Sequence, residues 1–225
     1  MIRLENVTKY YPTRKGRKYI FRDLNLDLPE KVNLGVLGLN GAGKSTLLRL
    51  IGGVDYPNYG KITIDGSISW PLGLSGGVQQ SLSGRDNAKF ICRVYGDDPQ
   101  TIDEKLKYII DFAELGEYFE LPVRTYSSGM RSRLLFAISM SFDFDTYLID
   151  EITAVGDLRF RKKSQEALRE KSTRSHYVMV SHNANDLIKE CDNLLVLINC
   201  KAYLFRNTEE GLKYYRKQIR ISNLQ

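Results

Sequence analysis

No apolar run in this sequence approaches the length of a membrane-spanning helix. The run from Leu194 to Ile198 is among the longest, whereas a helix needs about 20 apolar residues to cross a bilayer. The first residues, Met1 to Glu5, also lack the charged, apolar and small-residue regions of a signal peptide. We therefore expect a soluble, intracellular protein.

Cysteine and histidine are scarce. The three cysteines, Cys92, Cys191 and Cys200, are an odd number and lack the paired spacing of a metal site. We interpret them as buried or incidental thiols of a protein in a reducing compartment, and we assign them no chemistry. Of the 2 histidines, His176 stands between polar residues and a strand-like run, which predicts a surface position.

Neither charge nor length selects a function by itself. The chain has 33 basic and 27 acidic residues, so its net charge is +6. This charge permits nucleic acid or an anionic membrane as a neighbour but favours neither. With 225 residues, 42% of them hydrophobic, and without internal repeats or low-complexity linkers, the sequence predicts one compact domain with a substantial core.

The most informative stretch is a glycine-rich loop between two apolar runs. Leu34 to Leu37 reads as a strand, and Leu47 to Ile51 reads as the body of a helix. A Gly-x4-Gly-Lys-Ser loop between strand and helix directs free helix N–H groups at phosphate. A lysine there reaches the β and γ phosphates, and a serine hydroxyl binds Mg²⁺. The sequence therefore predicts a nucleoside triphosphate site at Gly38, Asn40, Gly41, Ala42, Gly43, Lys44, Ser45 and Thr46.

Apolar and polar residues alternate from Met1 to Asn33, which predicts half-buried antiparallel strands. The basic turn between them, Thr13 to Lys18, is read as a solvated hairpin tip in preference to a lipid-headgroup contact. Tyr10 and Tyr11, before this turn, are either core residues or an aromatic surface for an adenine ring.

The rest of the chain alternates between helical and strand patterns. Helical periodicity with a break at Asp98-Pro99 predicts a helical insertion between strands, and the last part of the chain reads as a strand pair followed by a basic amphipathic helix. The segments that carry these predictions are a strand at Lys61–Ile64, helices at Arg85–Tyr118 and Leu134–Phe142, strands at Thr146–Ile149 and Tyr177–Val180, a strand pair at Leu194–Phe205 and a helix at Glu209–Ile219.

Three polar residues stand at the ends of predicted strands. Asp150 and Glu151 close an apolar strand, where the first acid can bind the metal and the second can polarise the attacking water. His182 ends the next strand and could reach the γ-phosphate, because the ends of parallel strands converge on one sheet edge. Each of these features is common in ordinary structure, and each gains weight from the loop at Gly38 to Thr46.

A second anion-binding helix start is predicted at Tyr126 to Arg131. Its serines, its glycine and the free amides of the following helix favour phosphate. One chain cannot easily bring both helix starts onto one γ-phosphate. We therefore expect a partner subunit to supply the second.

Together these motifs resemble those of the nucleotide-binding subunits of ABC transporters, over essentially the whole chain. Gly38 to Ser45 is similar to the Walker A loop, Tyr147 to Asp150 to the Walker B strand, and Tyr126 to Met130 to the signature written Leu-Ser-Gly-Gly-Gln. The resemblance implies ATP and Mg²⁺ as cofactors. It also implies that Glu151 is the catalytic glutamate, that His182 is the switch histidine and that Ala154 to Asp157 form the D-loop. In the same way Tyr11 would stack on the adenine, and Ser127 and Gly129 would contact ATP. Gln79, or else Gln80, would be the Q-loop glutamine, which binds the metal together with Ser45 and Asp150.

Within that family, four stretches resemble the ATPase subunits that export capsular polysaccharide from Gram-negative bacteria: Ser69 to Leu72, Gln79 to Gly84, Tyr126 to Met130 and Tyr147 to Asp157. The resemblance implies a homodimer that works with a separate membrane permease at the cytoplasmic face of the bacterial inner membrane. It further implies periplasmic and outer-membrane export components. No nucleic acid partner is expected.

We therefore predict an α/β fold of the P-loop NTPase, ABC type. Residues 1–225 should form one domain with an antiparallel β subdomain, a parallel-sheet core and a helical subdomain at approximately 80–142. Three rival functions remain open: an O-antigen or teichoic acid exporter, a non-transport ABC ATPase acting on nucleic acid or ribosomes, and a P-loop kinase. The kinase would leave the stretch at Tyr126 and His182 unexplained.

Overall fold

The computed structural model describes every residue except 30, 73–77, 151–156, 182 and 223–225. The chain divides into two compact units. The sheet unit consists of Met1–Pro71, Phe144–Glu151 and Arg174–Gln225, and the helical unit consists of Leu72–Asp143 and Ile152–Thr173. In the described residues, no helix is both long enough and apolar enough to cross a membrane.

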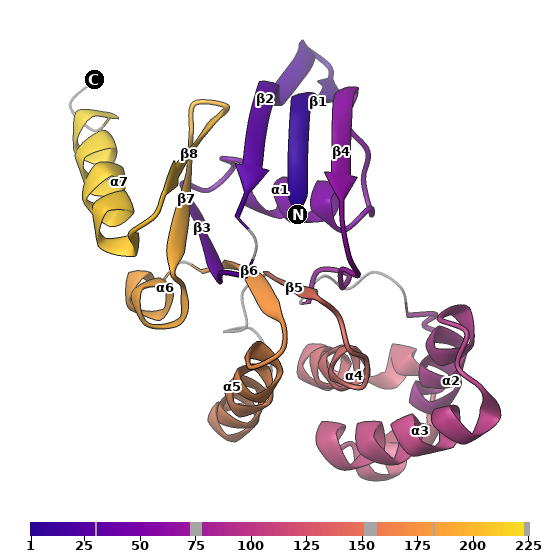
Figure 1. Ribbon diagram of the computed structural model, residues 1–225. Coiled ribbons are helices and arrows are strands. Elements are labelled where there is room, and N and C mark those ends of the chain that lie inside the picture. Colours follow the sequence, from indigo (N-terminus) through magenta and orange to yellow (C-terminus); the bar gives the residue numbers. More distant parts are fainter. Residues whose placement is uncertain (30, 73–77, 151–156, 182, 223–225) are drawn as a thin grey trace. The chain divides into compact units, whose positions relative to one another are not determined.

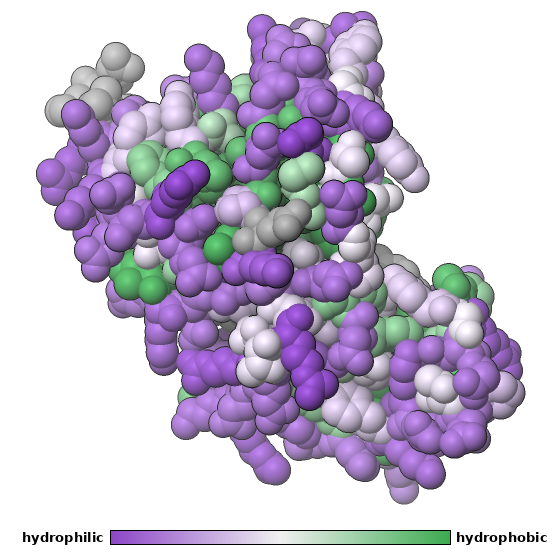
Figure 2. All heavy atoms as spheres, viewed as in Figure 1, coloured by the Kyte–Doolittle hydropathy of each residue, from purple (hydrophilic) through white to green (hydrophobic). Residues whose placement is uncertain are grey.

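An antiparallel sheet of three strands forms the first part of the sheet unit (Figure 1). Its order is β2-β1-β4, and the β1–β2 connection is the basic turn. Leu4 and Leu26 are cross-strand partners that point into the core, as the alternating pattern predicts. Figure 2 shows hydrophilic residues over the end of this sheet that carries the turn. The strands are β1 (Ile2–Thr13), β2 (Gly16–Leu28) and β4 (Tyr59–Ile64).

The second sheet is mainly parallel, with the order β5-β6-β3-β7-β8. Only the β7–β8 pair is antiparallel among its pairings. The central strand β3 is buried throughout, as an apolar run flanked by two parallel neighbours should be. The strands are β3 (Leu34–Gly38), β5 (Thr146–Asp150), β6 (His176–Val180), β7 (Asn193–Ile198) and β8 (Lys201–Phe205).

Three helices belong to the sheet unit, and one of them begins at the glycine-rich loop. They are α1 (Lys44–Ile51), α6 (Ala184–Glu190) and α7 (Thr208–Ser222). Leu47 and Leu48 of α1 are completely buried, together with Phe21 of β2 and Leu148 of β5. The helix that follows the loop is therefore fixed by a core shared with both sheets.

The described part of the helical unit contains no strand of its own. Helices α2, α3 and α4 begin at the side-chain caps Ser83, Asp98 and Ser127, each of which accepts a hydrogen bond from a backbone N–H of the first turn. The elements are α2 (Gly84–Val94), α3 (Pro99–Ala113), two short 3₁₀ turns (Gly116–Glu120 and Val123–Thr125), α4 (Ser128–Met140) and α5 (Leu158–Ser172).

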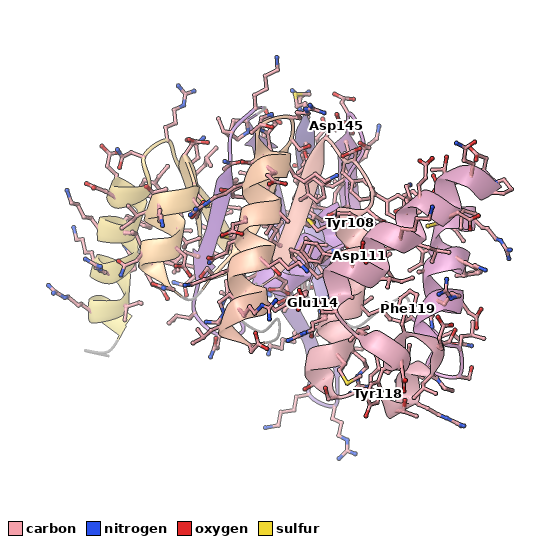
Figure 3. All side chains as sticks on the ribbon, turned by 90° about the horizontal axis from the view of Figure 1, so that it is seen from below. Tyr108, Asp111, Glu114, Tyr118, Phe119 and Asp145 are labelled. Atoms are coloured by element: carbon pink, nitrogen blue, oxygen red, sulfur yellow. The ribbon has the colours of Figure 1, made fainter. Side chains whose placement is uncertain are left out.

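An aromatic cluster joins α3, α4 and α5. Phe112 stacks on Phe136 with ring centroids 5.8 Å apart, and Phe160 meets both rings edge-on. Lys163 of α5 closes the carboxyl end of α3, because its Nζ donates to the carbonyl oxygens of Asp111 and Phe112 and to Glu114 Oε1. Figure 3 labels Asp111 and Glu114 at this end of α3.

The structure differs from the sequence-based expectation at two helices. Helices α5 and α6 were not predicted, whereas α4 begins at Ser128, within the helix start predicted at Tyr126 to Arg131 and before the apolar segment from Leu134. His176, expected at the surface, is half-buried at the start of β6, where its backbone N–H donates to the Asp145 carbonyl.

Candidate functional site

The loop between β3 and α1 has two positions at which a side chain would not fit. Gly43 has φ +102°, and a Cβ there would lie 2.5 Å from Ile20 Cγ2 and 2.9 Å from Phe21 Cζ. Gly38 lies so close to β7 that a Cβ would be 2.8 Å from the Leu197 carbonyl oxygen. The loop is therefore held against β2 on one side and β7 on the other, and its glycines are required by contact as well as by φ.

The amino-terminus of α1 is an open anion site. Gly43 precedes the helix in a left-handed conformation and provides no side-chain cap. The first hydrogen bond of the helix runs from Leu47 N to the Gly43 carbonyl at 2.8 Å, so the amides of Lys44, Ser45 and Thr46 have no acceptor within the helix. Together with the helix dipole, these amides form a site that fits a phosphate group.

Lys44 carries its positive charge within the loop. Its side chain is buried, and its Nζ donates to the carbonyl oxygens of Gly38 at 2.8 Å and Leu39 at 3.2 Å. These two contacts hold the ammonium within the loop that precedes α1. An anion bound at the helix start would meet a full positive charge as well as N–H donors.

Asp150 lies at the same edge of the parallel sheet as the loop. It pairs with Val180 of β6, and Val180 pairs with Val36 of β3, so Asp150 is level with Val36 and two strands away. The spacing of neighbouring strands puts its backbone about 10 Å from β3. Asp150 and Ser45 are both half-buried, so neither residue is closed off from solvent.

This arrangement fits Mg²⁺ bound together with a phosphate. Within the described residues, no group of three or more His, Cys, Asp or Glu side chains could hold a metal by itself. A metal at this edge would have one carboxylate, Asp150, and one hydroxyl, Ser45, and would take its remaining ligands from phosphate and water. That is how Mg²⁺ is usually bound at triphosphate sites.

The two tyrosines of β1 differ in what covers their rings. Arg17 lies over the ring of Tyr10 at 4.6 Å, and Tyr19 packs against the same ring with centroids 5.4 Å apart. Tyr11 is half-buried at the edge of the core, and its hydroxyl donates to Asp55 Oδ2 at 2.7 Å. Tyr11 is therefore the better candidate for contact with a base.

Four of the predicted site residues belong to the helical unit, and their surroundings are described within that unit. Ser127 caps α4 by accepting from Met130 N at 3.2 Å, and a Cβ on Gly129 would meet open space except for Ser127 Oγ at 3.9 Å. Asp157 caps α5 and also pairs with Arg133 at 2.6 Å. The backbone of Gln79 is tied to Asn87 in both directions, whereas its side chain is exposed, like that of Gln80.

The predicted catalytic residues Glu151 and His182, and the predicted D-loop residues 154–156, lie outside the described residues. Their roles remain predictions. Tyr126, which replaces leucine at the start of the signature, is buried, and its hydroxyl donates to the Tyr118 carbonyl at 2.6 Å. The hydroxyl group that tyrosine adds in place of leucine therefore has a hydrogen-bond partner within the helical unit.

The cysteines are not part of the site. Burial raises the pKa of the Cys92 thiol to about 11 and that of the Cys191 thiol to about 12, so both stay protonated and unreactive at neutral pH. A hollow of about 440 Å³ lies at the opposite edge of the parallel sheet, beside Asp145 and His176. Ligands of open parallel sheets bind at the carboxyl ends of the strands, so we assign this hollow no role in the site.

The sequence reasoning missed three residues that support the site. Ile20 and Phe21 of β2 define the space in which Gly43 sits, and Asp55, after α1, binds the hydroxyl of Tyr11. The alternating pattern indicated that Ile20 and Phe21 are buried, but it did not indicate that they pack against Gly43. For Asp55 no sequence signal was available, because its partners lie more than forty positions earlier.

Comparison with known proteins gives full-length relatives. The sequence profile of the family described as "ABC transporter" matches residues 21–154. The polysialic acid transport ATP-binding protein KpsT of Escherichia coli is 48% identical over 219 residues, which cover 96% of this chain and 96% of that protein. The capsule polysaccharide export ATP-binding protein CtrD of Neisseria meningitidis serogroup B is 45% identical over 215 residues, which cover 96% of this chain and 98% of that protein.

Among solved structures, a dimeric ATP-binding cassette in a post-hydrolysis state, bound to ADP and Pi, superposes with a TM-score of 0.76. It covers 89% of this chain and 96% of its own, at 21% identity. At this identity the likeness concerns the fold alone. The predicted α/β class, with an antiparallel sheet, a largely parallel sheet and a helical part, is confirmed.

Proposed function

This chain belongs to the ABC transporter family, and it is 48% identical to KpsT and 45% identical to CtrD over 96% of its length. We therefore propose that it is the ATPase subunit that drives export of a capsular polysaccharide. One observation carries the proposal. The phosphate loop, the open start of α1 and Asp150 share one sheet edge in a chain that matches CtrD over 96% of its length.

ATP binds with its phosphates in the loop. The amides at the start of α1 and the ammonium of Lys44 bind the β and γ phosphates, while Asn40, Ala42 and Thr46 complete the loop around them. Ser45 and Asp150, with Gln79, hold Mg²⁺. When bound, the ion neutralises charge that develops on the phosphate oxygens.

Hydrolysis requires groups that act on water and on the γ-phosphate. Glu151 follows Asp150 directly and accepts a proton from the attacking water, and His182 follows β6 and contacts the γ-phosphate. A second copy of the chain supplies Ser127 and Gly129, whose helix start faces the same phosphate, and Asp157. The active form is therefore a homodimer with two shared sites.

The transport step belongs to a different polypeptide. The described residues contain no helix able to cross a membrane, so a separate permease forms the path of the polysaccharide. This chain works at the cytoplasmic face of the bacterial inner membrane, and periplasmic and outer-membrane components complete the export route. Nucleic acid is not a partner.

Gene deletion and complementation test the function. Deletion in the bacterial host should remove surface polysaccharide and leave the polymer inside the cell. The wild-type gene should restore export, Lys44→Ala should not, and Lys213→Ala, an exposed lysine of α7, should behave as wild type. Accumulation of O-antigen or teichoic acid would assign the rival substrate, and intact export of every surface polymer would reject a transport role.

A further inference from the structure

Three side chains connect β1 to the segment that follows α1. The Nζ atom of Lys9 donates to Asp55 Oδ1 at 2.5 Å and to the Tyr56 carbonyl oxygen at 2.8 Å. The hydroxyl of Tyr11 donates to the other carboxylate oxygen, Asp55 Oδ2, at 2.7 Å. Asp55 Oδ1 also accepts from the backbone N–H of Tyr56 at 2.8 Å. Both oxygens of Asp55 are therefore occupied by donors.

The Lys9–Asp55 pair is largely removed from solvent. The Lys9 side chain is 7% exposed and that of Asp55 is 24% exposed. Partial burial alone would raise the pKa of Asp55, but hydrogen bonds from Lys9 and Tyr11 outweigh it and hold that pKa below its ordinary value. The carboxylate is therefore ionised at neutral pH, and its negative charge balances the positive charge of the buried Lys9 side chain.

These contacts restrict the ring of Tyr11 at two places. Its hydroxyl is bound by Asp55, and the ammonium of Lys9 lies 4.9 Å from the ring centroid. Within the described part of the chain, neither a second cation nor another aromatic ring packs on Tyr11. The ring thus has a fixed orientation and retains surface for a planar ligand, unlike the ring of Tyr10.

The same strand pair supports the phosphate loop. Lys9 is the cross-strand partner of Phe21, and Phe21 and Ile20 bound the space around Gly43. Tyr11 is two residues beyond Lys9 on β1, a distance of about 7 Å along a strand. The ring and the loop are therefore positioned by one rigid element.

We propose that Asp55 and Lys9 are positioning residues for nucleotide recognition, which hold the Tyr11 ring in the orientation that binds the adenine base. The proposal rests on the proposed function, in which the loop binds ATP and Tyr11 contacts its base. Neither positioning residue touches the nucleotide; both act through Tyr11.

A comparison of two ligands separates positioning of the base from general support of the fold. ATP and inorganic tripolyphosphate share the phosphates that the loop binds, but only ATP has a base. Binding of each, with Mg²⁺, is measured by calorimetry for the wild type and each variant. The ratio of the two dissociation constants reports the contribution of the nucleoside, and a change in that ratio at Tyr11 or Asp55 is assigned to the base contact.

We expect Asp55→Ala to weaken ATP binding about tenfold, within the range of base stacking on an aromatic side chain. Tripolyphosphate binding should stay within about twofold of wild type. Tyr11→Ala should give the same pattern, and the double variant should lose no more than Tyr11→Ala alone, since Asp55 acts through that ring. Asp55→Asn, which keeps an acceptor for Lys9, should be intermediate.

Asp97→Ala is a matched control. Asp97 forms a similar pair with Lys105 at 2.7 Å in the helical unit, and Lys105 also lies over an aromatic ring, that of Phe142. Its loss should lower stability without changing the ligand ratio. If Asp55→Ala and Asp55→Asn weaken both ligands equally, or neither, positioning by Asp55 is wrong. If Tyr11→Ala leaves the ratio unchanged, the assigned adenine contact itself is wrong, whatever Asp55 does.

Discussion

Gly43 shows how a single residue can control the geometry of the phosphate loop. Its φ of +102° is strained for any other residue, and its missing side chain makes room for Ile20 and Phe21. A left-handed conformation costs a residue with a Cβ roughly 1–2 kcal/mol, and forced overpacking typically costs about 1–3 kcal/mol more. The loop can keep its shape only with glycine at this position.

We expect Gly43→Ala to lower stability by roughly 2–5 kcal/mol and to abolish ATP binding, because the loop must move to relieve the contact. Thermal unfolding and a nucleotide titration measure the two effects. Gly96→Ala is the control, since Gly96 has φ +82° with nothing within 4 Å of a Cβ. It should carry only the smaller backbone cost and bind ATP normally. Equal effects of the two variants would contradict the packing argument.

At the scale of elements, Lys163 determines how α5 joins α3. Its ammonium binds two carbonyl oxygens at the carboxyl end of α3, where a positive charge also favours the helix dipole. We expect Lys163→Met to lower the free energy of unfolding by about 1.5–2 kcal/mol, the lower part of the range for hydrogen bonds to a charged group, because Lys163 is partly exposed. Urea unfolding measures this loss.

Lys162→Met is the neighbouring control, because Lys162 is exposed on the same helix and should change stability by less than about 0.5 kcal/mol. The hydrogen bond from Lys163 also holds the pKa of Glu114 below its ordinary value. A depressed carboxyl pKa stabilises the folded state above the unfolded pKa and loses that effect as pH falls. The difference between wild type and Lys163→Met should therefore narrow in acid. A constant difference would show that Glu114 does not contribute.

The sequence predicted elements where the apolar pattern was strong and missed them where it was weak. Strands β3, β5 and β7 are nearly continuous apolar runs, so their places were clear. Helix α5 buries only Phe160, Ser164 and Leu168 along a charged sequence, which left too little apolar periodicity to detect. The first turn of α4 is exposed or half-buried, so the apolar pattern begins only at Leu134, and it was the serines and the glycine that indicated the helix start at Tyr126 to Arg131.

The candidate site likewise has one part that the sequence predicts and another part that depends on contacts between distant segments. The loop from Gly38 to Thr46 depends on local chain geometry, and its sequence pattern carries that geometry. The family resemblance assigned the adenine contact to Tyr11, but the physical reason to prefer Tyr11 over Tyr10 depends on which side chains cover each ring, and Arg17 and Asp55 reach these rings from other segments. Such contacts are set by the register of β1 with β2 and by the position of α1, which no local pattern records.

At the scale of the whole molecule, the shared-site hypothesis predicts that ATP drives association of two chains. Glu151→Gln should bind ATP but slow hydrolysis by about two or more orders of magnitude, the scale of general-base loss. With ATP and Mg²⁺ this variant should shift from monomer to dimer, because trapped nucleotide stabilises the associated form. Light scattering with and without nucleotide measures the shift.

Gly129→Arg in the same background should abolish the shift. A side chain at Gly129 has open space, and Ser127 keeps its capping bond, so the helix should remain intact. Gln100→Arg adds the same charge to an exposed site on α3 and should leave dimerisation unchanged. A Gly129→Arg chain that still dimerises, or that is folded but fails to bind ATP as a monomer, would show that this stretch acts within its own chain.

The strand order of the parallel sheet also has a consequence for biosynthesis. Strand β3, which presents the phosphate loop, pairs in the described residues with β6 and β7, and both lie far downstream of it. At usual translation rates, roughly 10 to 30 s separate the emergence of β3 from that of β6. During this interval an apolar strand leaves the ribosome before either hydrogen-bonding neighbour exists. We therefore expect the nascent chain to be prone to aggregation until β6 and β7 emerge, and to complete its phosphate loop late, after the segments α2 to α4 of the helical unit have been made.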